Sequence, residues 1–209
     1  MPKVILFDLG GVIFRDIYSG GCADFASLIG LPEKRVLEAY AATDVPEWTE
    51  GKISDEARWK LFADKLGLAE SSIKLCAENF NIVFKPIPEV VDLLESLHVS
   101  GKFKLGVLSD QHPGAVRYLY QSQRKVMDLF DPSLVFISSH VGFSKHEPNN
   151  KFFQYAIGHS GVAANEILFV DDSLRNVTNA SKAAMMTYFF DRNGHTIVDL
   201  VVGLRALLA

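Results

Sequence analysis

Short, uninterrupted apolar runs recur along the chain and predict buried strands. The five runs span residues 4–7, 103–108, 134–137, 167–170 and 185–190. Runs that are apolar throughout, rather than alternating with polar residues, are typical of strands covered on both faces, as in a parallel sheet. We therefore expect a buried parallel sheet with helices on its two faces.

Segments with helical spacing of apolar residues separate these runs from residue 88 onward. In residues 88–98, one face carries Val90, Val91, Leu94 and Leu97, a period close to that of an α-helix. The other helical segments span residues 113–123, 150–159, 174–184 and 196–208. Strands that alternate with helices predict an α/β fold with a helix-covered sheet.

The stretch from residue 16 to residue 85 has a different pattern. Helical periodicity continues through it without a convincing strand, over residues 22–29, 33–42, 55–66 and 71–84. We therefore expect two domains. The core domain comprises residues 1–15 and 86–209, and an α-helical domain of residues 16–85 is inserted after the first strand.

Composition and charge exclude several classes of partner. Of the 209 residues, 48% are hydrophobic and 22% charged, as in ordinary globular proteins, and the net charge is −4. Because the chain has no basic run, we expect neither a nucleic-acid nor a membrane partner. An anionic substrate must then be attracted by local groups or by a bound cation.

The cysteines and the apolar opening indicate a cytoplasmic protein. Cys22 and Cys76 fit no metal-binding spacing, and two thiols in a chain of this size are expected to stay reduced. The opening VILFDLGGVIF carries Asp8 in its middle and is a poor signal peptide, and no stretch approaches the length of a membrane span. No heptad pattern is evident, so a monomer is favoured, and an oligomer stays open.

Polar residues follow the predicted strands at the point where each strand ends. They are Asp8, then Ser109 with Asp110, then Asp171 with Asp172, and Lys145 follows the third strand by a short loop. Ligands of an open parallel sheet bind beyond the carboxyl ends of its strands. Clustered carboxylates favour an oxygen-seeking cation such as Mg²⁺. A cation with hydroxyl and ammonium donors is also what a phosphoryl group requires.

These residues resemble the four ordered motifs of the haloacid dehalogenase superfamily. The matching segments are Phe7-Asp8-Leu9-Gly10-Gly11-Val12, Leu108-Ser109, Lys145, and Phe169-Val170-Asp171-Asp172 with Asn176. The resemblance implies a Rossmann-like, three-layer α/β/α core with five main strands, and the helical insertion resembles the family's small α-helical cap. Residues 48–54 are similar to a cap segment of bacterial sugar-phosphate phosphatases, including α-glucose-1-phosphate phosphatases.

The resemblance also implies a nucleophile and a metal site. Asp8 would attack phosphorus and form an aspartyl-phosphate, which divides one difficult displacement into two. Mg²⁺ would be held by Asp8, the Gly10 carbonyl and Asp172. Asp171 and Asn176 would lie in or near the outer coordination sphere.

A second set of residues would contact the phosphoryl group. Ser109 and the Gly11 amide would donate hydrogen bonds to its oxygens, and Lys145 would neutralise its charge and that of the nucleophile. Asp110 is placed beside the phosphate, where the family often has asparagine. Two readings of this carboxyl group stay open, one in which it is turned away and one in which it tunes the site.

Gly10 departs from the pattern of most phosphatases in this family. They carry an aspartate two residues after the nucleophile as general acid and base, and such a group is worth roughly 10² to 10⁴ in rate. We therefore expect leaving groups that need little protonation, or transfer of the phosphoryl group to an acceptor other than water. A substitute acid from the inserted helices or from His112 stays open.

These observations favour a Mg²⁺-dependent phosphatase that acts on a small phosphorylated metabolite, with sugar phosphates preferred. Because Gly10 replaces the usual aspartate, phosphonatase, dehalogenase and phosphotransferase chemistry stay open as alternatives. A catalytically weak protein that binds a phosphorylated ligand is the alternative from another class. The retained Asp8, Ser109, Lys145 and Asp172 weigh against it.

Overall fold

Five parallel strands form one sheet in the order β3-β2-β1-β4-β5. The computed structural model describes residues 1–191 and 196–208. The strands are β1 (Val4–Phe7), β2 (Lys104–Ser109), β3 (Val135–Ile137), β4 (Ile167–Asp171) and β5 (Met186–Phe189). All five predicted runs form strands, with ends shifted by at most one residue, and the predicted parallel α/β fold is confirmed.

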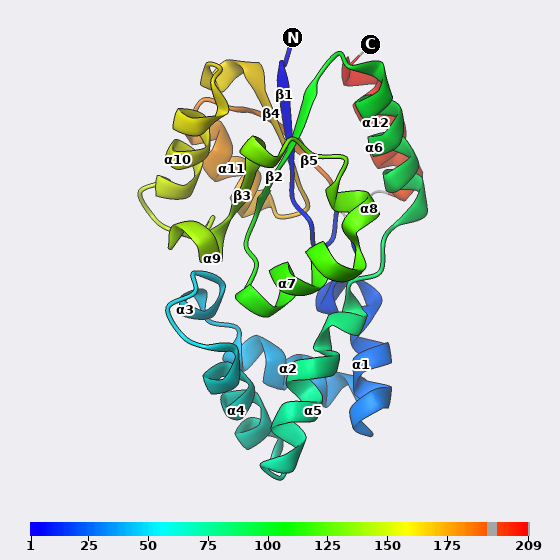
Figure 1. Ribbon diagram of the computed structural model, residues 1–209, viewed down its shortest axis with the longest axis vertical. Helices are drawn as coiled ribbons and strands as arrows, with labels where there is room; N and C mark the ends of the chain where they lie inside the picture. The colour runs from blue at the N-terminus through cyan, green and yellow to red at the C-terminus, as the bar shows by residue number, and fades with distance from the viewer. Residues whose placement is uncertain (192–195, 209) are drawn as a thin grey trace.

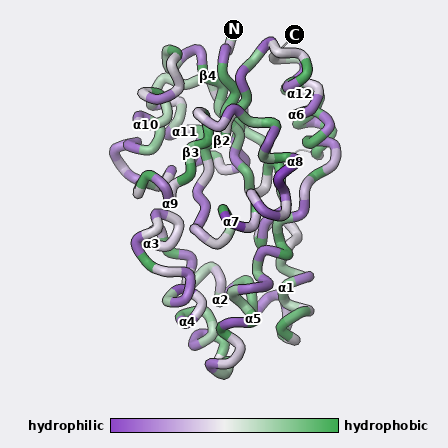
Figure 2. Tube along the Cα trace, in the orientation of Figure 1, coloured by the Kyte–Doolittle hydropathy of each residue, from purple (hydrophilic) through white to green (hydrophobic). Residues whose placement is uncertain are grey.

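Successive residues of β1 point into two different cores, which makes the fold a three-layer one. Val4 and Leu6 belong to one buried cluster and Ile5 and Phe7 to the other, as expected from the two-residue repeat of a strand. Figure 2 shows hydrophobic positions along the strands in the centre of this part of the molecule. A strand buried on both faces has no room for polar residues until it ends.

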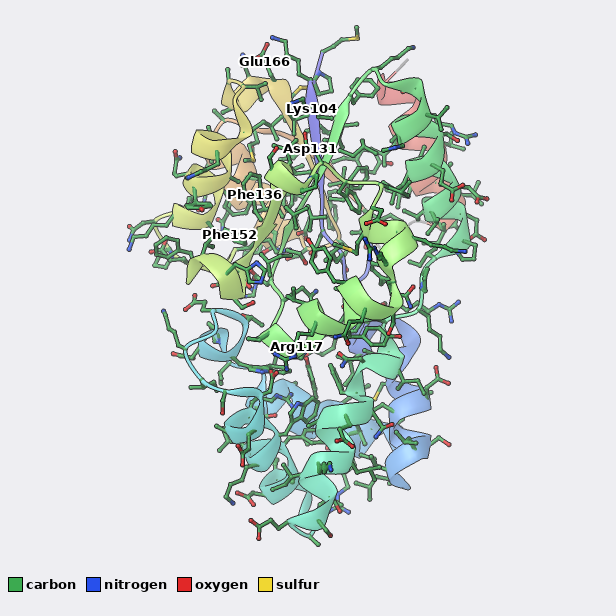
Figure 3. The ribbon with its side chains drawn as sticks, viewed as in Figure 1. Lys104, Arg117, Asp131, Phe136, Phe152 and Glu166 are labelled. Carbon is green, nitrogen blue, oxygen red and sulfur yellow. The ribbon has the colours of Figure 1, made fainter. Side chains whose placement is uncertain are left out.

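Helices cover both faces of the sheet (Figure 1). The Val4 and Leu6 face packs against α10 (Lys151–Ser160) and α11 (Leu174–Lys182), and Figure 3 shows Phe136 and Phe152 on this side. The helices that share the other cluster are α6 (Pro88–Ser100), α7 (Pro113–Ser122), α8 (Arg124–Met127) and α12 (Ile197–Leu208). Short turns complete the core: η3 (Pro132–Leu134), α9 (Ser138–Val141) and η4 (Ala164–Glu166).

The helical insertion lies beyond the carboxyl ends of the strands (Figure 1). Its elements are η1 (Ile17–Gly21), α1 (Cys22–Ile29), α2 (Glu33–Thr43), α3 (Pro46–Thr49), α4 (Asp55–Leu66), α5 (Ser71–Asn79) and η2 (Phe80–Val83). The predicted helix over residues 71–84 is α-helical only to Asn79 and continues as a 3₁₀ turn. Pro86 follows closely, and a proline disfavours helical geometry in the residue before it.

Two linking segments connect the insertion to the sheet and run side by side. The Arg15 amide donates to the Lys85 carbonyl (2.8 Å) and the Ile87 amide to the Ile13 carbonyl (2.9 Å). Gly21 lies where the segments converge, and a Cβ atom there would come within 2.6 Å of the Asp16 carbonyl oxygen and 2.7 Å of Val83 Cβ. Only glycine fits this close approach.

Aromatic side chains fill the centre of the insertion. Phe25, Trp59 and Phe80 contact one another, with ring centroids between 4.8 and 6.1 Å apart. The fully buried guanidinium of Arg58 lies 4.4 Å from the ring centroid of Trp48. Among the described residues, no helix is both long enough and apolar enough to cross a membrane.

Candidate active site

Asp8 lies at the carboxyl end of the central strand and is held by hydrogen bonds to both of its oxygens. Its amide pairs with the Val170 carbonyl at 2.9 Å, which continues the β1–β4 ladder by one residue. The Ser109 hydroxyl (2.5 Å) and the Leu9 amide (2.8 Å) donate to Oδ1. Lys145 Nζ lies 2.8 Å from Oδ2. The carboxylate is therefore oriented before any ligand binds.

Lys145 joins two carboxylates inside the protein. Its side chain is 2% exposed, and Nζ lies 2.7 Å from Asp171 Oδ2 as well as close to Asp8. Burial disfavours the ammonium form, but the charges of Asp171, Asp8 and Asp110 outweigh it and raise the pKa of Lys145. The lysine is therefore a fixed positive charge and not a base at neutral pH.

Three carboxylates gather beside this lysine. Oxygen atoms of Asp8, Asp171 and Asp172 lie within 4.8 Å of one another. The Ser173 amide (2.7 Å) and Asn176 Nδ2 (3.1 Å) donate to Asp171 and orient it. Three negative charges against one ammonium leave an excess of negative charge, and oxygen donors at this spacing fit a hard divalent cation. Buried Asn176 Oδ1 has no hydrogen-bond partner among the described residues, so this cavity-lining residue keeps an acceptor that a bound group could use.

The residues predicted to contact a phosphoryl group have different hydrogen-bond partners in this structure. Ser109 is fully buried, and its hydroxyl is directed at Asp8. The Gly11 amide donates to the Phe14 carbonyl at 2.7 Å, within its own turn. Asp110 lines the pocket, but its carboxyl group accepts from the Lys145 amide at 3.0 Å. Burial raises the pKa of Asp110 to about 7.

A cavity of about 320 Å³ lies between the sheet and the insertion. The core lines it with Asp8, Gly10, Asp110, Lys145, His146, Asp172 and Asn176, among others. The insertion contributes mainly apolar and aromatic side chains: Ile17, Tyr18, Tyr40, Val45, Pro46, Phe80, Val83 and Phe84. It also contributes Asp16, Asp44 and Thr49. One end of the cavity is thus charged and the other largely apolar.

Asp55, at the start of α4, joins the insertion to the core. Its carboxylate contacts His112 Nδ1 at 3.0 Å, Trp48 Nε1 at 2.8 Å and an Arg117 guanidinium nitrogen at 2.9 Å. Figure 3 shows Arg117 at the seam between α7 and the insertion. Burial opposes ionisation, but the His112, Trp48 and Arg117 contacts hold the pKa of Asp55 well below its usual range. We name these four residues the Asp55 cluster.

A second pair of contacts joins the C-terminal end of α3 to the core. The Ser138 hydroxyl donates to the Thr49 carbonyl at 2.5 Å, and the Ser144 hydroxyl donates to the Glu50 carboxylate at 2.7 Å. The partners are 89 and 94 residues apart in the chain. Sequence reasoning missed both this contact and the Asp55 cluster, because no local pattern marks such pairs.

Comparison with known proteins supports the family resemblance of the sequence motifs. The family model of haloacid dehalogenase-like hydrolases matches residues 2–184. A curated relative, drimenol cyclase drtB of Aspergillus calidoustus, is 25% identical over an alignment of 207 positions, which covers 92% of this chain. The chain spans only about a third (34%) of the length of that relative.

Solved structures share the fold. HAD family enzyme BT-2542 from Bacteroides thetaiotaomicron, in complex with magnesium and inorganic phosphate, is 20% identical with a TM-score of 0.70, over 94% of this chain and 97% of that one. L-2-haloacid dehalogenase from Xanthobacter autotrophicus is 19% identical with a TM-score of 0.68, over 99% and 88%. Because the family model matches most of its length, the chain belongs to the haloacid dehalogenase-like hydrolases, and the position of Asp8 at the end of the central strand agrees with this.

Proposed function

We propose that the protein is a Mg²⁺-dependent phosphatase that hydrolyses a small phosphomonoester through a phosphorylated Asp8. The observation that carries this proposal is the pairing of Asp8 with Lys145 at the edge of a cavity that Asp172 also lines. An oriented carboxylate beside a fixed cation suits attack on an anionic phosphoryl group. We propose further that residues 16–85 act as a cap that closes over the substrate.

In the proposed reaction, an Asp8 oxygen attacks phosphorus while the bond from phosphorus to the leaving oxygen breaks. Water then attacks phosphorus, the bond to Asp8 breaks, and inorganic phosphate leaves. Lys145 offsets negative charge on the carboxylate and on the phosphoryl oxygens in both steps. Ser109 and the Leu9 amide keep the carboxylate in one orientation.

The carboxylate cluster fits a resident Mg²⁺ ion. Asp8, the Gly10 carbonyl and Asp172 would hold it, with Asp171 and Asn176 beside them. When bound, the ion supplies a positive charge that draws in the phosphoryl group and stabilises its negative charge. The BT-2542 complex with magnesium and inorganic phosphate supports this proposal by likeness of fold.

The L-2-haloacid dehalogenase likeness makes dehalogenation the second candidate. Gly10 favours it, because displacement of a halide from carbon requires no proton on the leaving group. The cluster of Asp8, Asp171 and Asp172 favours the phosphatase instead, because a reaction without phosphate needs no site for a divalent cation.

The cavity restricts the substrate to a small molecule. Rings such as Tyr40 and Phe80 can stack on an aryl group or on the apolar face of a sugar. Tyr18 donates to Asp44 at 3.1 Å, and this pair offers hydrogen bonds to a hydroxyl group. We propose sugar phosphates as the physiological class, with one chain acting alone in the cytoplasm.

Hydrolysis assays with and without Mg²⁺ test the proposal. The substrates are p-nitrophenyl phosphate, a hexose phosphate panel and 2-chloropropionate, and the variants are wild type, Asp8→Asn and the surface control Asp64→Asn. We expect Mg²⁺-dependent phosphate release by wild type and Asp64→Asn, and a loss of at least about 10³-fold in Asp8→Asn. Metal-independent halide release would support the dehalogenase, and phosphate release that survives in Asp8→Asn would contradict the proposal.

A further inference from the structure

The position that lacks the usual acid is filled by another carboxyl group. A Cβ atom on Gly10 would lie 3.3 Å from Asp16 Oδ2, 3.4 Å from Asp16 Cβ and 3.7 Å from Asp16 Cγ. These are close packing distances, so the Asp16 side chain lies in the space that a side chain at position 10 would enter. Gly10 and Asp16 also line the same cavity as Asp8 and Lys145.

A tight turn brings residue 16 back beside residue 10. The Gly11 amide donates to the Phe14 carbonyl (2.7 Å), and the Phe14 amide donates to the Leu9 carbonyl (2.8 Å). Gly11 has a φ of +76°, in the left-handed region that favours glycine. The chain therefore folds back after Asp8, and Asp16 is the first residue past the turn that carries a carboxyl group.

The two oxygens of Asp16 have different surroundings. Oδ1 accepts from the amides of Tyr18 (3.0 Å) and Ser19 (2.7 Å) and from the Ser19 hydroxyl (2.6 Å), and so caps η1. Oδ2 is the oxygen that lies against Gly10. The hydrogen bonds to Oδ1 fix the orientation of the whole group, with Oδ2 on the side of Gly10.

We infer that Asp16 is the proton-transferring residue of the reaction proposed above, and supplies the carboxyl group that position 10 lacks. This inference rests on the proposed phosphatase function. In the first step, the Asp16 carboxyl group gives its proton to the leaving oxygen as the phosphorus–oxygen bond breaks and the Asp8–phosphorus bond forms. In the second step, the Asp16 carboxylate takes a proton from the attacking water as the Asp8–phosphorus bond breaks. The proton that Asp16 gives up in the first step is thus replaced in the second.

His112 is the competing residue, and its surroundings favour a structural role. Its Nδ1 is bound to Asp55, and its ring is stacked on Trp48 with centroids 3.8 Å apart. Its Nε2 is buried and has no hydrogen-bond partner among the described residues. Because Nε2 is covered by protein, the imidazole secures the seam of core and insertion, whereas Asp16 lies against the loop of the nucleophile.

Relocating the carboxyl group tests the inference. The variants are Asp16→Asn and Asp16→Ser, both of which keep an oxygen that can cap η1, together with Gly10→Asp and the double variant Gly10→Asp/Asp16→Ser, in which the smaller serine makes room for a side chain at position 10. His112→Gln is measured alongside. The probes are p-nitrophenyl phosphate, whose leaving group needs little protonation, and an alkyl phosphate such as glucose 6-phosphate. Melting curves with Mg²⁺ and inorganic phosphate establish that each variant folds and still binds both.

We expect Asp16→Asn to lower alkyl phosphate turnover by roughly 10² to 10⁴, and p-nitrophenyl phosphate turnover by a smaller factor. Gly10→Asp alone should give no gain, because it sets two carboxyl groups against each other. The double variant should recover at least about tenfold over Asp16→Ser on the alkyl phosphate. A purely structural Asp16 could not be rescued from position 10, since a side chain there does not cap η1.

Two results would overturn the inference while the proposed function stands. One is an equal loss on both probes in Asp16→Asn with no recovery in the double variant. The other is a loss that depends on the leaving group in His112→Gln but not in Asp16→Asn, which would assign the proton transfer to His112. If wild type releases no phosphate from either probe, the proposed function fails and the inference with it.

Discussion

The positive charge of Lys145 offsets the negative charges of the carboxylates buried around it. It is the cation that contacts both Asp8 and Asp171, at 2.8 and 2.7 Å. Removing one partner of a buried ion pair leaves an uncompensated charge, which costs about 3–5 kcal/mol. Here the lysine contacts two carboxylates, and a bound divalent cation would compensate part of its loss.

Lys145→Met should therefore lower the free energy of unfolding by about 3–5 kcal/mol without Mg²⁺, and by less with it. Urea unfolding with and without Mg²⁺ measures this, together with catalytic turnover, which should be lost. Lys151→Met is the matched control, because the side chain of Lys151 is exposed where it pairs with Glu147 at 3.7 Å, and its loss should change stability by no more than about 1 kcal/mol. A Lys145→Met variant that unfolds at the wild-type urea concentration would refute this account of the site.

At the residue scale, the sequence identifies groups that follow strands and misses groups placed by turns. Asp8, Asp171 and Asp172 come directly after apolar runs, so their convergence follows from the parallel sheet. The positions of the Gly11 amide and of Asp16 could not be predicted in this way, because neither group directly follows an apolar run. The turn at Leu9–Phe14 directs the Gly11 amide inward and brings Asp16 to Gly10, and such geometry has no apolar periodicity to reveal it.

At the scale of elements, the Asp55 cluster holds the first turn of α4 against α7. Asp55 accepts from groups on both sides of the seam. Its pKa is depressed in the folded protein, so its contribution to stability is present above the unfolded pKa of about 3.9 and is lost as pH falls through the lower folded value.

The difference in free energy of unfolding between wild type and Asp55→Asn should therefore be largest above about pH 5 and shrink as the pH falls below about 4. Urea unfolding at several pH values between 7 and 2.5 measures it. Asp64→Asn on the same helix is the control, because Asp64 forms an exposed pair with Lys60 and is worth under about 1 kcal/mol. A difference that stays constant over this pH range would refute the role assigned to Asp55.

The ends of a helix were predictable where the sequence carries a capping residue at its start and a glycine at its end. The predicted helix over residues 55–66 coincides with α4, because Ser54 caps its start and Gly67 ends it in the left-handed conformation. The short elements η1, α3, α8 and α9 were not predicted, because four or five residues are too few to show a helical period. Two of them, η1 and α3, supply pocket residues.

At the scale of the whole molecule, the sheet supplies the charged end of the cavity and the insertion closes the other end. The core was predictable, since apolar runs and helical spacing determine a three-layer sheet of this kind. The seam was not, because its contacts join residues 57 to 94 positions apart. The apolar side chains that the insertion turns toward the cavity were hidden from sequence reasoning for the same reason.

Trapping the phosphorylated nucleophile tests whether Asp8 carries the phosphoryl group during turnover. Enzyme is mixed with p-nitrophenyl phosphate and Mg²⁺, quenched with acid after milliseconds to seconds, treated with borohydride and analysed by peptide mass spectrometry. Borohydride reduces an acyl phosphate on Asp8 to homoserine, so we expect homoserine at position 8 only when both substrate and Mg²⁺ are present. Phosphate release with an unmodified Asp8 at every quench time, or conversion of a different carboxylate, would contradict it.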